Sequence, residues 1–455
     1  MRSGLASLVL AVAVAAGLPA RAHADGDDTA EAPPLPPRRA VPDLDGRPPS
    51  DADAALEAAL WVPRIITSPL YLISEYVIRV PLGALLTVLE REGVIDWLFA
   101  SGGQVGVIPT AFFEFGLSPS VGLYAFYDRF LFDENRISAH AATWGEDWLR
   151  LIVRDRVRLT EQTELALRFE AGTRPDQLFE GIGYDSTQST RGRFGVERME
   201  GRLELKISPW RRSAFEVQAG YRSLGFEDER WNGERSLLET HAVAPTGYLT
   251  GYELLFFRAD LLIDTHEPTE ELTRSRVRAR AFAEQNAAFG GLTQDEPRLF
   301  SSWVRWGGEL AVSTDFFGRG RALMLRFRTE LVSSLQEPAL IPFYELPDAG
   351  GRGPLSGFIT GQLRGQSTLG LTLEYVWPVY ALLDGFTEIT VGNAFGTHYE
   401  GFDWDRLRLA WAIGIIPRFA GEHLVEISFG LGTETFENGT QLSQARLVVG
   451  ARHGL

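Results

Sequence analysis

Residue types that could support catalysis or bind a metal are scattered along this sequence. There is no cysteine, which excludes thiolate metal sites, disulfides and a cysteine nucleophile. A Gly-x-Ser-x-Gly elbow and a phosphate-binding glycine loop are also missing, and Ser186 follows Asp185 in what reads as a surface turn. We therefore predict that the protein is not an enzyme, with no catalytic residue, no metal and no cofactor. The 7 histidines, none at metal-ligand spacing, are His23, His140, His241, His266, His398, His423 and His453.

Charged side chains instead form ladders in which every second residue is charged and the residues between are apolar. This period of two predicts β-strands with one polar and one apolar face. The ladders could line a selectivity path, or they could be a paired structural network inside a barrel. Interior charges are routine in barrels, which favours the structural network. The clearest ladders lie at 149–159, 164–170, 202–207, 276–284, 323–331 and 406–415.

The sheet that positions these ladders is predicted to be a transmembrane antiparallel β-barrel, an all-β fold. A soluble sandwich also alternates, but these segments are about ten residues or longer, the length at which a tilted strand crosses a bilayer. A closed barrel also pairs every backbone group in lipid. The expected strands number sixteen, with fourteen or eighteen left open: 104–116, 120–131, 137–144, 147–159, 163–173, 193–208, 211–223, 248–264, 274–285, 300–315, 321–335, 366–377, 386–396, 404–416, 422–432 and 443–452.

The connections between the expected strands alternate in length. Short turns at 160–162, 209–212 and 317–320 suit a periplasmic side, and long connections at about 174–192, 224–247, 286–299 and 336–365 suit the outside. The barrel should therefore present elaborate loops at one end only.

Three segments precede the barrel. Residues 1–24 are typical of a cleavable signal peptide, with Arg2, an apolar run and an Ala-His-Ala cleavage site. Residues 25–54 form a Pro-rich, disordered linker. Residues 55–103 form an amphipathic helical segment divided by prolines, which could cap the barrel or dock a partner. The formal charge of −16 argues against nucleic acid as a partner.

The longest connection carries the most specific motif. Residues 342–365 contain Gly350-Gly351, then Leu355-Ser356-Gly357-Phe358, and the next expected strand ends in Glu374-Tyr375-Val376-Trp377-Pro378. Further on stand Thr390-Val391-Gly392-Asn393-Ala394-Phe395, and earlier Phe179 to Ser186 contain Gly181-Ile182-Gly183. This set resembles the bacterial surface antigen D15 group, the barrel domain of the Omp85 superfamily of Gram-negative bacteria. The resemblance implies a loop that folds into the lumen between strands eleven and twelve.

The motif departs from the family at its charged positions. Ser356 stands where the family carries arginine, and Thr390 stands where the following strand carries its acidic partner. Because both charges are missing together, no buried ion is left alone. We expect the loop to fold inward, held by Ser356 and Thr390, with Arg352 or Arg364 as substitute cations and Glu374 as a possible partner.

The resemblance implies a function in the insertion, translocation or organisation of outer-membrane components. The soluble periplasmic domains with which Omp85 assembly factors receive clients are not recognisable between residues 24 and 104, so that activity does not follow directly. The alternatives are a plugged structural barrel and a passive porin for small solutes. The expected location is the cell outer membrane, and the expected partners are outer-membrane lipids, lipopolysaccharide and the machinery that inserts the barrel itself, with client or periplasmic partner unknown.

Overall fold

The computed structural model describes residues 99–100, 104–266, 276–289, 301–315, 321–336, 341–380, 383–417 and 423–453. The expected signal peptide and the linker lie outside these ranges. Of the expected helical segment, only residues 99–100 are described. In the described ranges, no helix is long and apolar enough to cross a membrane.

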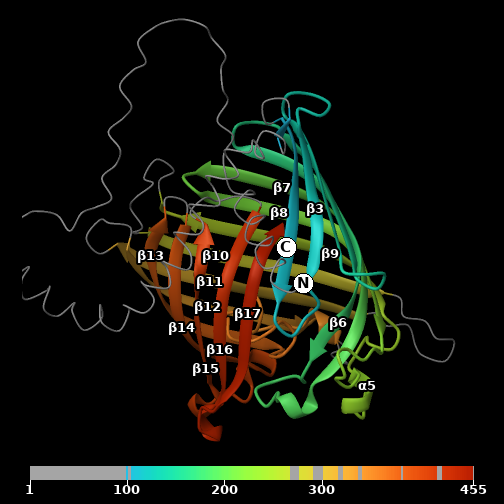
Figure 1. Cartoon of the computed structure of the whole chain (residues 1–455), viewed down its shortest axis with the longest axis vertical. Helices are drawn as coiled ribbons and strands as arrows, with labels where there is room; N and C mark the ends of the chain where they lie inside the picture. Colours follow the sequence, from blue (N-terminus) through green and yellow to red (C-terminus); the bar gives the residue numbers. More distant parts are fainter. Residues whose placement is uncertain are drawn as a thin grey trace, which may run out of the picture. The chain divides into compact units, whose positions relative to one another are not determined.

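Sixteen antiparallel strands form one closed sheet, in which each strand pairs with its neighbours in sequence and the last pairs with the first (Figure 1). This confirms the predicted sixteen-stranded antiparallel barrel. The strands are β2 (Val105–Glu114), β3 (Ser120–Asp128), β4 (Asn135–Thr143), β5 (Leu149–Arg158), β6 (Thr163–Phe179), β7 (Gly192–Trp210), β8 (Ser213–Glu227), β9 (Tyr252–Asp264), β10 (Arg276–Phe289), β11 (Ser301–Asp315), β12 (Ala322–Ser334), β13 (Ser367–Tyr380), β14 (Leu383–Phe395), β15 (Arg408–Pro417), β16 (His423–Thr435) and β17 (Leu442–His453).

A further two-residue strand, β1 (Phe99–Ala100), pairs with the start of β2. It lies at the end of the segment for which the sequence predicts helices, so at these two residues the backbone is extended instead.

The two faces of the sheet differ as the alternation predicts. Outward side chains such as Leu151, Leu167 and Leu203 are 42%, 60% and 50% exposed, whereas the inward Glu170 and Glu200 are 8% and 2% exposed. Apolar residues therefore face outward and charged residues face the lumen, which is the reverse of a soluble protein.

The barrel has two unlike ends. The end that carries the connections after the even-numbered strands, including 228–251 and 335–366, is called the long-loop end, and the other the short-turn end. β6 extends further toward the long-loop end than the sequence predicts, because its pairing with β7 continues past a bulge at Arg174 and Gln177 to Phe179 and Gly192. The short helix α5 (Leu237–Thr240) lies at this end, with a capping box formed by Ser236 and Glu239.

Candidate functional site

The connection between β12 and β13 folds into the lumen at the long-loop end. Its described part, residues 341–366, is here called the inward loop. Phe343 and Leu355 are fully buried, and Ile359, Gln362 and Leu363 are each 1% exposed. A surface loop with this burial is unusual, since loops ordinarily keep their backbone in contact with water. The inward loop therefore behaves as part of the core.

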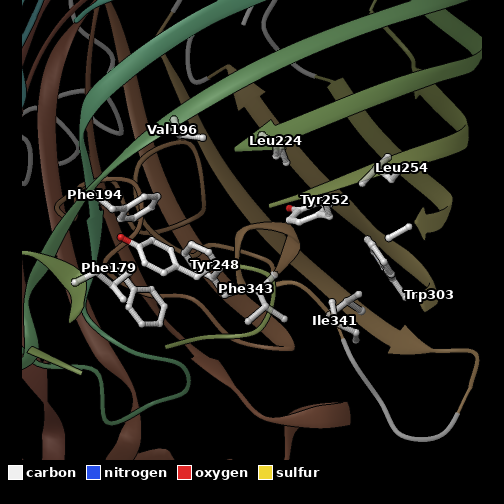
Figure 2. Close-up of a cluster of buried hydrophobic side chains, with 14 of the residues drawn as sticks. Phe179, Phe194, Val196, Leu224, Tyr248, Tyr252, Leu254, Trp303, Ile341 and Phe343 are labelled. Atoms are coloured by element: carbon white, nitrogen blue, oxygen red, sulfur yellow. The ribbon is translucent and has the colours of Figure 1, made fainter. Parts of the chain in front are cut away.

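The first half of the inward loop is anchored on the wall formed by β6 to β12. Phe343 lies among aromatic rings from three separate segments, with ring centroids 5.4 Å from Phe179, 5.4 Å from Phe194 and 5.9 Å from Tyr248 (Figure 2). The rings meet largely edge to face, the arrangement that aromatic pairs favour. Figure 2 shows Tyr252, Leu254, Trp303 and Ile341 continuing the same cluster along the wall.

A buried carboxylate fixes the same half of the loop. Glu345 is 3% exposed and accepts two hydrogen bonds from the Arg222 guanidinium, at 3.1 and 2.9 Å, and a third from the Tyr252 hydroxyl at 3.1 Å. Arg222 also donates to Glu200 at 2.6 Å. The loop is thus tied into the charge ladder of β7 and β8.

The middle of the inward loop is a compact hairpin. The carboxylate of Asp348 accepts hydrogen bonds from the backbone N–H groups of Gly350 and Gly361, and Asp348 faces Arg364 in an antiparallel bridge. Burial raises the pKa of the Asp348 carboxyl, against the opposing effects of Arg364 and the two N–H groups. Gly351 has φ +60°, and a Cβ there would meet the Thr360 hydroxyl. The glycine pair is therefore required by the turn itself.

The tip of the inward loop reaches the opposite wall. A Cβ at Gly357 would lie 2.2 Å from the Leu431 carbonyl oxygen, so glycine is needed for the backbone to approach β16 this closely. The Phe358 ring lies against Gly432, where a Cβ would meet it at 2.5 Å. Leu355, Phe358 and Leu363 share a buried cluster with residues of β14 and β15. The inward loop therefore spans the lumen from wall to wall.

Ser356 contacts an acidic residue, but not at the position that the motif indicates. Its hydroxyl donates to Glu388 on β14, and Arg326 on β12 donates to Glu388 at 3.3 Å and also binds Glu374. Glu388 lies two residues before Thr390 and on the same face of β14. The acidic partner is therefore present, displaced by one inward-facing position.

The other residues expected to hold the loop have different contacts. Thr390 exchanges a hydrogen bond with Thr372 at 2.8 Å, between β14 and β13. Arg364 donates to the Tyr344 carbonyl at 3.1 Å and stacks on the Tyr344 ring, so it braces the loop internally. The carbonyl of Arg352 accepts from Arg328 at 2.7 Å. Burial, together with nearby Arg150, lowers the pKa of Arg352.

The cation at the loop tip comes from the last strand. Arg446 of β17 donates to the Ser356 carbonyl at 3.2 Å and to the Glu114 carboxylate of β2 at 2.7 Å. Both ionised side chains are buried, at 4% and 3% exposure. Sequence reasoning missed Arg446, Glu114 and Glu388. Their only signal is that each is a charged residue on an inward face, which many other positions share.

The glycine-containing segment after β6 packs on the inward loop. Ile182 bridges to Arg364, and the Gly183 N–H donates to the Arg364 carbonyl at 2.7 Å. Asn393 of β14 and Arg408 of β15 both donate to the Tyr184 carbonyl, each at 3.4 Å. The three segments that carry the family resemblance, 179–186, 342–365 and 390–395, therefore meet in one place.

The junction of β2 and β17, here called the seam, has the shortest strand register in the described part of the closed sheet. Its register covers three residue pairs, Glu114 with Val448, Phe113 with Val449, and Phe112 with Gly450. In the described part of the sheet, every other pair of neighbouring strands from β2 to β17 shares seven or more, the fewest being between β15 and β16. The seam, the ion pair of Arg446 and Glu114, and the tip of the inward loop lie together.

This arrangement can be compared with known proteins. No protein-family model matches the chain, and no curated protein matches it. Among solved structures, BamA from Haemophilus ducreyi lacking POTRA domains 1-3 superposes with a TM-score of 0.52, at 11% identity, over 76% of this chain and 70% of that one. The chain has the BamA barrel fold. The fold expected from the Omp85 resemblance is thereby confirmed.

Two further solved structures have a lower similarity to this barrel. CdiB from Acinetobacter baumannii and CdiB from Escherichia coli have TM-scores of 0.49 and 0.48, at 9% and 12% identity, each over 76% of this chain. The chain spans 59% and 63% of their respective lengths. At these identities the likeness concerns the fold alone.

Proposed function

We propose that this BamA-type barrel acts in the outer membrane in the insertion, translocation or organisation of other outer-membrane components, by opening at the seam. The observation that carries the proposal is the three-pair register between β2 and β17. A sheet edge that is not fully paired is a template for another strand, and adding a strand to such an edge is a common mode of recognition. The substrate class would be an unfolded outer-membrane chain.

Two residues keep the seam short. Pro109 lies in the middle of β2 and has no N–H to donate, so it weakens pairing on this edge. Gly450 has φ +151°, and a Cβ there would lie 2.3 Å from the Ala111 carbonyl oxygen. β17 thus leaves the regular register near Gly450, and the described residues of β1 pair with Val105 and Gly106 of β2. Residues 451–453, the described part of β17 beyond Gly450, add no further pair with β2.

The inward loop argues against a passive porin. It crosses the lumen at the long-loop end and is fixed at both walls by buried contacts. A plugged structural barrel shares this feature, so the seam is what separates the two possibilities. A purely structural barrel gains nothing from a weak junction, whereas an inserting barrel needs one. Because the loop tip contacts Arg446 of β17, a movement of the inward loop would also move the seam.

The test is to lock the seam with a disulfide. The chain has no native cysteine, so Phe113→Cys with Val449→Cys, two residues paired in register, gives a single possible crosslink. Val121→Cys with Thr143→Cys, a pair between β3 and β4, is the matched control. The full chain is placed in vesicles, and the folding rate of a urea-unfolded small outer-membrane barrel is followed.

We expect the reduced protein to speed this folding, the seam crosslink to return it to the rate in protein-free vesicles, and reduction to restore the gain. The control crosslink should change nothing. Acceleration that survives the locked seam would exclude the seam as the route. If no form accelerates folding, the proposed function is wrong and the plugged structural barrel is favoured.

A further inference from the structure

A pocket of about 430 Å³ lies at the long-loop end, and none of its lining residues belongs to the inward loop or to the seam register. It is built by connections that are far apart in sequence: the turn after β2, the turn after β4, the end of β6 and the connection after β8. Its lining residues are Ser118, Trp144, Asp147, Trp148, Pro175, Glu229, Arg230 and Trp231. Its volume is within the range of small-molecule sites.

Three of the lining residues are tryptophans that differ in exposure and in hydrogen bonding. Trp231 donates its indole N–H to the Ser118 hydroxyl at 3.0 Å, and the Arg193 guanidinium lies 4.7 Å from its ring centroid. Trp148 is 7% exposed, and its Nε1 has no hydrogen-bond partner. Trp144 is 48% exposed, so its ring is available to a ligand. A buried N–H group without a hydrogen-bond partner, such as that of Trp148, lowers stability and is rare in native proteins.

The charged residues that line the pocket are mainly acidic, and the two guanidinium groups that lie on its tryptophan rings, Arg174 and Arg193, are paired with Asp176 and Glu234. Asp147 and Glu229 line it, and burial together with Glu227 and Asp147 raises the pKa of Glu229. The one lining cation, Arg230, is already paired with Glu239. An anionic ligand is therefore disfavoured. A ligand that accepts a hydrogen bond from Trp148 and donates hydrogen bonds to carboxylates would match these lining residues.

We infer that this pocket binds a neutral saccharide. Sugar hydroxyls both accept and donate, so one hydroxyl can accept from Trp148 Nε1 while others donate to Asp147 and Glu229. The apolar C–H face of a sugar ring stacks on an indole, as Trp144 allows. An organic cation would suit the aromatic rings and the negative charge. An ammonium group has no acceptor, however, and would leave the Trp148 N–H unpaired. The inference does not depend on the proposed function of the seam.

The experiment uses the full chain refolded in a polyoxyethylene detergent, because a maltoside headgroup would itself compete. Binding to an array of neutral oligosaccharides is measured first, and the dissociation constant of the best one is then measured by calorimetry. Lipopolysaccharide with and without its O-polysaccharide shows whether the sugar is carried by a lipid or is free. Tetramethylammonium is titrated as the cationic probe.

Trp148→Phe keeps an aromatic ring but removes the N–H, and it should weaken binding about fivefold to tenfold. Trp144→Ala should abolish binding, and because this residue is exposed the barrel should fold normally. Trp210→Ala is the matched control, since Trp210 is equally exposed, at 48%, but lies at the short-turn end. Absence of any saccharide binding, binding unaffected by Trp144→Ala, or a preference for tetramethylammonium would each overturn the inference.

Discussion

At residue 345, one carboxylate ties the inward loop to the barrel wall. Glu345 is buried and is bound by Arg222 and Tyr252, and Arg222 in turn bridges to Glu200. Removing one partner of a buried ion pair is costly because the remaining charge stays desolvated. The loop residues that pack in the aromatic cluster on this wall lie within a few residues of Glu345. Removal of the Glu345 carboxylate should therefore loosen the whole inward loop.

Glu345→Ala should lower the free energy of unfolding by about 3 to 5 kcal/mol, the range for breaking a buried pair. The measurement is urea-induced unfolding of the refolded barrel, with protease cleavage between residues 341 and 366 as a local readout. Asp133→Ala, which breaks the exposed pair with Arg129, is the control and should leave both unchanged. Similar behaviour of the two variants would show that the buried pair does not hold the loop.

At the scale of elements, the inward loop is held at two points on opposite walls, and a compact hairpin lies between these points. The aromatic cluster around Phe343 holds one side, and the packing of Gly357 and Phe358 on β16 holds the other. The hairpin closes on itself where Asp348 faces Arg364. The tip can thus be removed without disturbing the first anchor.

Replacing residues 349–363 by two glycines joins Asp348 to Arg364 across an existing bridge and should open the lumen. The intact protein should show small, flickering currents in a planar bilayer, and the variant large and steady ones. Gly357→Ala should give intermediate openings because its Cβ collides with the Leu431 carbonyl, and Gly201→Ala, with open space around its Cβ, should give none. Large steady currents in the intact protein would instead identify a porin.

At the scale of the whole molecule, closure of the barrel joins residues from the two ends of the sheet. The ion pair of Arg446 and Glu114 crosses the seam and is buried on both sides. Arg446 also holds the Ser356 carbonyl. A single guanidinium therefore links closure of the barrel to the position of the plug.

Arg446→Met should destabilise the barrel by about 3 to 5 kcal/mol, because the Glu114 carboxylate loses its guanidinium in a buried site. The double variant Arg446→Met with Glu114→Met should recover most of that loss, since an apolar pair of similar volume replaces an ion pair at little net cost. The urea midpoint of each variant gives the comparison. A double variant as unstable as the single one would show that the pair has no specific role in closure.

The strand pattern was largely predictable from sequence, and the contacts between strands were not. Alternation is local, so 163–173 and 321–335 could be placed from their own residues. The extension of β6 to Phe179 could not, because it depends on continued pairing with β7. The choice of Glu388 over Thr390 as the partner of Ser356 also lay beyond sequence reasoning. This choice of partner depends on how far the tip of the inward loop extends into the lumen.

The sequence by itself determined that the fold is a membrane barrel of about sixteen strands and which face of each strand meets lipid, because both follow from period-two alternation and from the need to pair every backbone group in a membrane. The inward loop was expected from its resemblance to the D15 group. Only the tertiary structure decided where the seam lies, which residues Arg446 contacts, and that three tryptophans line one pocket. Arg446 and Glu114 are 332 residues apart. Contacts over such separations depend on the register of every intervening strand and on closure of the sheet.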